Sequence, residues 1–140
     1  MNQKNEVSIL LVEDDDVDYM VIKRSFASQR IANPLIRASD GIEALELLRN
    51  GTVKHPYIIL LDLQMPRMGG LEFLDKIRHD PDLSGSVVFV LTTSKSEEDI
   101  AESYGRHIAG YFIKDATGQG FLDIVSLLEG YWRVVVLPGE

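Results

Sequence analysis

Five short apolar runs alternate with longer stretches of helical pattern along this 140-residue chain, and this alternation limits the possible fold more than any other feature. Runs of this length are typical of buried strands and too short for independent helices. They are Val7–Val12, Leu35–Ala38, Tyr57–Leu61, Val87–Leu91 and Tyr111–Ile113, of which Leu35–Ala38 is the weakest. Strands that alternate with helices predict an α/β fold with a parallel sheet covered on both faces.

The first two intervening segments carry clear helix signals. Asp16–Phe26 is predicted to be a helix with an apolar face. That face is expected to contain Val17, Met20 and Val21, widened by Tyr19, Ile22 and Phe26. Asp40 is expected to cap the next helix, with Glu43 three residues later as in a capping box, and Gly51 to end it.

The other three helices follow from the same kinds of signal. Leu71, Leu74 and Ile77 indicate a third helix that ends before Pro81, and Ser96 is expected to cap a fourth whose acidic first turn favours the helix dipole. A last helix is predicted from Phe121 to about Leu137. The whole pattern predicts a doubly wound five-stranded sheet, in which chemistry lies beyond the carboxyl ends of the strands. The expected strand order, 2-1-3-4-5, is taken from a known fold of this class rather than from the pattern itself.

Polar residues follow those strand ends. Glu13 and Asp14 follow the first strand, Asp62 the third, Thr92 the fourth and Lys114 the fifth. Carboxylates brought this close need a cation or a proton to coexist, and Mg²⁺ prefers such oxygen ligands. A hydroxyl and an ammonium opposite the metal would suit a phosphoryl group, which a carboxylate can accept as an acyl phosphate.

With these motifs, the sequence resembles the receiver domains of two-component signalling. The resemblance spans about residues 7–130 and includes Met65-Pro66-Arg67-Met68-Gly69-Gly70 after Asp62 and Gly110-Tyr111-Phe112-Ile113 before Lys114. It implies a flavodoxin-like receiver fold and a phosphoryl group accepted on Asp62 from a histidine kinase. The resemblance thus implies a signalling role, in which the chain would catalyse only its own phosphorylation and slow dephosphorylation.

The resemblance also assigns roles to the other site residues. Asp14, Asp62 and the backbone carbonyl of Gln64 would bind Mg²⁺, and Glu13 would hold a metal-bound water. Thr92 would move to the phosphoryl group and Lys114 would pair with it. Tyr111 would report the switch; its alternative role is a packed strand aromatic. In the family a proline usually follows the lysine, whereas here it is Asp115, so we predict a trans Lys114–Asp115 bond.

A narrower resemblance points to the small response regulators of bacterial phytochromes. The similar segments are residues 12–15, 91–100 and 131–138. The leading interpretation is therefore a stand-alone response regulator that signals by altered protein–protein interaction or by phosphorelay. Two alternatives remain: an unphosphorylated receiver-like interaction module, and a phosphatase with an aspartyl nucleophile. The second is weakened because such enzymes carry another Asp where this chain has Gln64.

Composition excludes several other classes of function. The net charge of −8 argues against nucleic-acid binding, and the absence of Cys excludes disulfides and cysteine-bound zinc. We find no signal peptide and no membrane span, so a cytoplasmic protein is expected.

Residues 1–6 are expected to be disordered and 7–130 to form the receiver domain. Residues 131–140, with Tyr131, Trp132 and Val134–Leu137, either end a core helix or, as we predict, join a homodimer interface.

Overall fold

A five-stranded parallel sheet of order β2-β1-β3-β4-β5 forms the centre of the computed structural model, which describes residues 6–114 and 118–139. The strands are β1 (Ser8–Val12), β2 (Leu35–Ala38), β3 (Tyr57–Leu61), β4 (Val87–Thr92) and β5 (Gly110–Ile113). The helices are α1 (Asp16–Ser28), α2 (Gly41–Arg49), α3 (Gly70–His79), α4 (Glu97–Gly105) and α5 (Gly118–Val134). The predicted fold class and strand order are confirmed.

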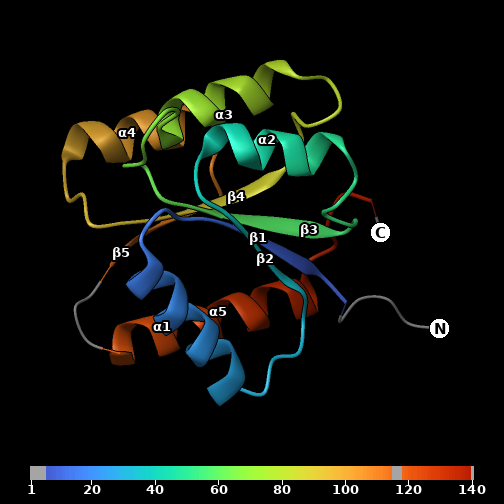
Figure 1. Cartoon of the computed structure of the whole chain (residues 1–140), viewed down its shortest axis with the longest axis vertical. Coiled ribbons are helices and arrows are strands. Elements are labelled where there is room, and N and C mark those ends of the chain that lie inside the picture. The colour runs from blue at the N-terminus through green and yellow to red at the C-terminus, as the bar shows by residue number, and fades with distance from the viewer. Residues whose placement is uncertain (1–5, 115–117, 140) are drawn as a thin grey trace.

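Two hydrophobic cores lie on opposite faces of the sheet. Helices α2, α3 and α4 cover one face, and α1 and α5 cover the other (Figure 1). Side chains of each strand alternate between the two cores: Leu10 and Ile59 face α2 and α3, while Ile9 and Ile58 face α1 and α5. Because a strand covered on both faces needs apolar residues at every position, the central strands are continuous apolar runs.

Three helix starts follow the sequence signals. The Asp15 carboxylate accepts from the N–H groups of Val17 and Asp18 at the start of α1. Asp40 caps α2 as predicted, and the Ser96 hydroxyl accepts from the Asp99 N–H at the start of α4. These caps fix where each helix leaves the strand before it, and so fix the loops that carry the site.

The predicted apolar face of α1 is partly wrong. Ile22, Ser25 and Phe26 are the buried residues of this helix, whereas Val17 and Met20 are exposed. At 3.6 residues per turn, Met20 lies on nearly the opposite side of the helix from Ile22. Only one of the two apolar stripes can face the sheet, and the i, i+4 pair of Ile22 and Phe26 takes that place.

The last helix is shorter than predicted, since it ends at Val134 rather than near Leu137. Trp132 and Leu137 are buried in the core of the protein itself, with exposed fractions of 1% and 2%. Their expected place in a dimer interface is therefore wrong, whereas Val134 and Val136 remain exposed. The disorder expected for residues 1–6 concerns residues that lie mostly outside the described ones. The predicted trans Lys114–Asp115 bond also lies partly outside them. Among those described, we find no helix that could cross a membrane.

Candidate functional site

The carboxyl ends of the strands bring the predicted site residues to one edge of the sheet. The Asp62 N–H donates to the carbonyl of Val12 over 3.0 Å, which fixes the end of β3 beside the end of β1. The Lys114 N–H donates to the carbonyl of Thr92 over 2.7 Å and fixes the end of β5 beside β4. These two backbone hydrogen bonds fix the positions from which four of the candidate side chains extend.

Three carboxylates converge there. One oxygen each of Glu13, Asp14 and Asp62 lie within 4.8 Å of one another. Glu13 and Asp62 are buried, and Asp14 is exposed to solvent. An all-oxygen set with an open side fits a hard divalent cation such as Mg²⁺, which keeps several of its waters. Gln64 also adjoins the cluster, because its N–H donates to Asp62 Oδ1 over 3.2 Å.

The ammonium of Lys114 lies among carboxylates. Its Nζ is 2.7 Å from Glu13 Oε1 and 3.1 Å from Asp62 Oδ2. A third contact, 2.8 Å to Asp18 Oδ2, was not predicted from the sequence. Asp18 lies in the first turn of α1, where an acidic residue is expected for the helix dipole alone, so no sequence signal distinguished it.

The pKa values of Glu13 and Lys114 both shift upward. Burial raises the pKa of Glu13 to about 7, assisted by the charge of Asp62 and opposed by the hydrogen bond from Lys114. Burial alone would lower the pKa of Lys114, but hydrogen bonds to Asp18 and Glu13 outweigh it and raise that pKa above its usual range. Lys114 thus stays charged, whereas the Glu13 carboxylate gains a proton easily when no metal is bound.

Thr92 has a buried hydroxyl without a partner. The residue is fully buried, and its Oγ1 makes no hydrogen bond to any described residue. An unpaired buried hydroxyl costs free energy, which an incoming acceptor oxygen would recover. Two residues further on, the carbonyl of Ser94 accepts a 2.9 Å hydrogen bond from the hydroxyl of Tyr111. The two predicted switch residues are thus linked to the same short segment after β4.

The loop after Asp62 is closely packed. A Cβ on Gly70 would lie 2.7 Å from the Asp62 carbonyl oxygen, so no other residue fits there without a shift of the backbone. Arg67 adopts a positive φ of 62°, and its Nε donates to Asp40 Oδ2 over 2.6 Å. The loop after Asp62 is therefore attached to the start of α2.

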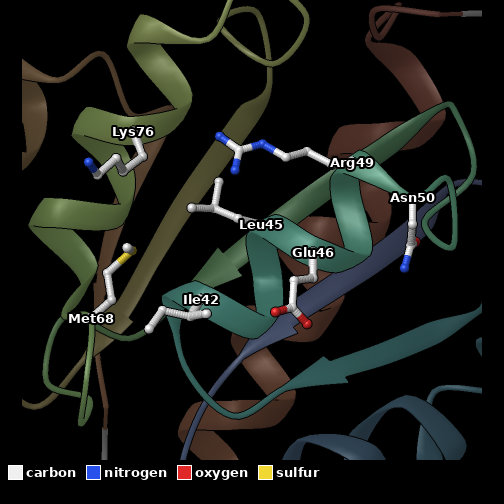
Figure 2. Close-up of a pocket in the computed structure, with 7 residues that line it drawn as sticks. All are labelled: Ile42, Leu45, Glu46, Arg49, Asn50, Met68 and Lys76. Atoms are coloured by element: carbon white, nitrogen blue, oxygen red, sulfur yellow. The ribbon is translucent and has the colours of Figure 1, made fainter.

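A surface groove lies between α2 and α3, away from the carboxylates. Figure 2 shows its lining residues, with Met68 and Lys76 on one side and the side chains of α2 on the other. They are Ile42, Leu45, Glu46, Arg49, Asn50, Met68 and Lys76. Met68 belongs to the loop after Asp62 and so connects this groove with the site.

Comparison with known families decides what this arrangement is. The model of the response regulator receiver domain matches residues 9–126. The chain is a response regulator receiver domain. Receiver domains are signalling proteins that accept a phosphoryl group from histidine kinases and bind a divalent metal, which does not support the phosphatase alternative.

The similar proteins agree with the narrower resemblance. The response regulator Rcp1 of Synechocystis is 36% identical over 135 residues, covering 93% of this chain and 92% of its own length. The phosphorylated cyanobacterial phytochrome response regulator RcpA is 34% identical with a TM-score of 0.85, over 96% of this chain and 99% of RcpA. RPA3017, a regulator in red-light signalling of R. palustris, is 30% identical with a TM-score of 0.86, over 96% of this chain and 99% of its own.

Proposed function

We propose that Asp62 is the phosphoacceptor of this receiver domain. The observation that supports it most is the set of groups around its carboxylate. An Asp62 oxygen lies within 4.8 Å of oxygens of Glu13 and Asp14, which could hold a cation, and Asp62 Oδ2 lies 3.1 Å from the Lys114 ammonium. A phosphoryl group on Asp62 would thus meet positive charge from a bound cation and from Lys114, which is what its oxygens require.

The transfer itself is a substitution at phosphorus. An Asp62 oxygen attacks the phosphorus of the phosphohistidine on the kinase, the P–N bond breaks, and the imidazole leaves with its electron pair. Lys114 pairs with a phosphoryl oxygen, and the Thr92 hydroxyl gains the acceptor that it lacks in the unphosphorylated protein. Tyr111, bonded to the segment after Thr92, then responds to the movement of that segment.

The metal in this proposal is Mg²⁺, and the oxygen donors present fit it. Asp14, Asp62 and the Gln64 carbonyl would hold it, with Glu13 acting through a water. The bound ion would neutralise charge on the phosphoryl oxygens. One solved relative, Rcp1, is a Mn²⁺-bound form at 35% identity and a TM-score of 0.82, covering 95% of this chain and 99% of its own, which supports the binding of a divalent metal by this chain.

We propose a phytochrome-type histidine kinase as the phosphodonor, because both RcpA and RPA3017 are named for phytochrome or red-light signalling. The output would be altered binding to a downstream protein, or phosphorelay. We also retain a homodimer, now assigned to the exposed apolar residues Leu127, Val134 and Val136 rather than to Trp132.

Phosphorylation by acetyl phosphate tests the assignment of Asp62. In Mg²⁺, the wild-type protein should gain one phosphoryl group by intact-mass analysis, and Asp62→Asn should gain none. Asp16→Asn is the matched control, since Asp16 is an 86% exposed carboxylate near the site that contacts Arg37 instead of Lys114. Full labelling of Asp62→Asn would refute the assignment.

The metal ligands need a separate experiment. Asp14→Ala should abolish Mg²⁺-dependent labelling while leaving the fold intact, because the Asp14 side chain is exposed and supports no packing. A Mg²⁺ titration of labelling, with circular dichroism as the control for folding, measures this. An unchanged titration curve would remove Asp14 from the metal site.

A further inference from the structure

We propose that Asp18 is a positioning residue that competes with the phosphoryl group for Lys114. The proposal rests on the phosphorylation of Asp62 proposed above and adds a residue that the receiver motifs do not include. Asp18 Oδ2 lies 2.8 Å from Lys114 Nζ, close to the 2.7 Å from that nitrogen to Glu13 Oε1 and shorter than the 3.1 Å to Asp62 Oδ2. In the unphosphorylated protein, Asp18 and Glu13 therefore both compete with Asp62 for the ammonium.

The contact has a defined origin in the fold. Asp15 caps α1 and accepts from the Asp18 N–H over 3.1 Å, which fixes the backbone of Asp18 in the first turn of the helix. From there its side chain reaches the ammonium across the space between α1 and β5. The side chain of Lys114 is 7% exposed and that of Asp18 is 26% exposed, so water screens this pair less than a pair on the open surface.

A phosphoryl group on Asp62 changes the balance at Lys114. The group brings about two negative charges to the carboxylate that already shares this ammonium with Asp18. The Asp18 carboxylate then repels the phosphoryl oxygens and also occupies one of the three N–H donors of Lys114. Both effects oppose phosphorylation. Asp18 therefore stabilises the unphosphorylated state relative to the phosphorylated one and lowers the affinity of the site for a phosphoryl group.

Helix stability does not explain the contact. The capping of α1 is provided by Asp15, and Asp16 supplies a first-turn charge of its own. Exchange of Asp18 for Asn keeps the size of the side chain and its local hydrogen bonding while it removes the charge. The variant therefore separates the effect on Lys114 from any effect on α1.

The test is the binding of beryllofluoride, an anionic phosphoryl mimic, at saturating Mg²⁺, followed by backbone amide shifts. Asp18→Asn should reach half-saturation at a roughly three- to tenfold lower beryllofluoride concentration than wild type, the range expected for a partly exposed charge pair. Asp18→Glu, which keeps the carboxylate, should behave as wild type does. A purely structural role for Asp18 would give no such rescue.

Matched controls make each result decisive. Asp16→Asn removes the same charge from the same helical turn without touching Lys114 and should leave the binding curve nearly unchanged. Equal or weaker binding by Asp18→Asn would overturn the proposal, and Asp18→Ser replaces it if Asn does not fold. If wild type binds no beryllofluoride, the phosphoacceptor assignment itself fails; if wild type binds and Asp18→Asn matches it, only the role of Asp18 fails.

Discussion

Glu13 shows how a single residue can link metal binding to stability. Its side chain is almost fully buried, with one oxygen 2.7 Å from Lys114 and the other accepting from the Asp15 N–H. Burial raises its pKa from 4.5 to about 7. Keeping this group ionised in the folded protein is therefore unfavourable even beside the Lys114 ammonium, and a further positive charge, such as a metal ion, would make it less so.

The stability of the metal-free protein should depend on pH through Glu13. Because its folded pKa is above its unfolded value, the contribution of Glu13 is fully present below pH 4.5 and is lost as pH rises through about 7. Between pH 5 and pH 8 in EDTA, wild type should lose about 1–3 kcal/mol of unfolding free energy relative to Glu13→Gln. Urea titrations at several pH values measure this, and Mg²⁺ should reduce the loss. Parallel pH profiles of the two proteins would contradict it.

At the scale of single residues, the sequence identified the site residues but not every contact that they make. Glu13, Asp14, Asp62, Thr92 and Lys114 all lie where their positions after strands predict, because carboxyl ends of parallel strands share one edge. Asp18 was missed because its contact with Lys114 joins residues 96 positions apart in the sequence, which no local pattern encodes. The structure shows the positions of these residues, while the roles assigned to them, and to Gln64 and Tyr111, remain predictions.

The helices and loops around the site are joined by specific hydrogen bonds as well as by packing. Asp40 both caps α2, by accepting from the Glu43 N–H over 2.9 Å, and accepts from Arg67 in the loop after Asp62. Burial opposes its ionisation, but these hydrogen bonds lower the pKa of Asp40 below its usual value. One carboxylate thus stabilises a helix start and positions the loop after Asp62.

Replacement of Asp40 should cost more than replacement of its partner. Asp40→Ala removes a cap and leaves the Glu43 N–H unpaired, for a loss of about 1–2 kcal/mol in unfolding free energy. Arg67→Ala should cost less, because the Arg67 side chain is largely exposed and leaves Asp40 still bonded to Glu43. Urea denaturation of both variants compares them, and a larger loss from Arg67→Ala would show that the ion pair, not the cap, is the dominant interaction.

Local sequence signals predicted where the helices begin better than they predicted which helix face is buried. The caps at Asp40 and Ser96 are confirmed because each depends on a side chain and a few neighbouring N–H groups. The face of α1 was misjudged because this helix has two apolar stripes, and the sheet and α5 select Ile22 and Phe26 over Val17 and Met20. That choice is made by tertiary packing, which periodicity alone does not determine.

Across the whole molecule, α5 and the segment after it complete the core on the α1 side. Trp132 packs against Phe26 of α1, with ring centroids 6.5 Å apart, and Leu137 belongs to the same cluster. The prediction of an interface here failed for these residues because composition shows that a segment is apolar but not which surface it covers. Among the described residues of α5 and the segment after it, Leu127, Val134 and Val136 are exposed.

Trp132→Ala should therefore strongly destabilise the monomeric fold. Loss of a fully buried indole costs about 3–5 kcal/mol, through lost apolar burial and the cavity left behind. Val134→Ala is the matched control on the same helix: its side chain is 78% exposed, and it should change stability by no more than about 0.5 kcal/mol. Denaturation followed by circular dichroism measures both. A small effect of Trp132→Ala would mean that the end of α5 is not part of the core.

The homodimer prediction now concerns the outer surface of α5 and the residues after it. Val134→Lys combined with Val136→Lys should abolish dimerisation without unfolding the protein, because both side chains are exposed. Light scattering at tens of micromolar, with and without phosphorylation, compares this variant with wild type. A monomeric wild type under both conditions would show that these valines are ordinary surface residues.

Trp132 is also the only tryptophan of the chain, and its position makes it an intrinsic optical reporter. It lies near the end of α5, and that helix ends on the side of the sheet away from the carboxyl ends of the strands (Figure 1). Its emission should be blue-shifted in the native protein and shift to the red when the α1–α5 layer opens. Fluorescence of the unlabelled protein would therefore follow unfolding and be nearly insensitive to ion binding at the distant edge, so the two processes can be recorded separately in one sample.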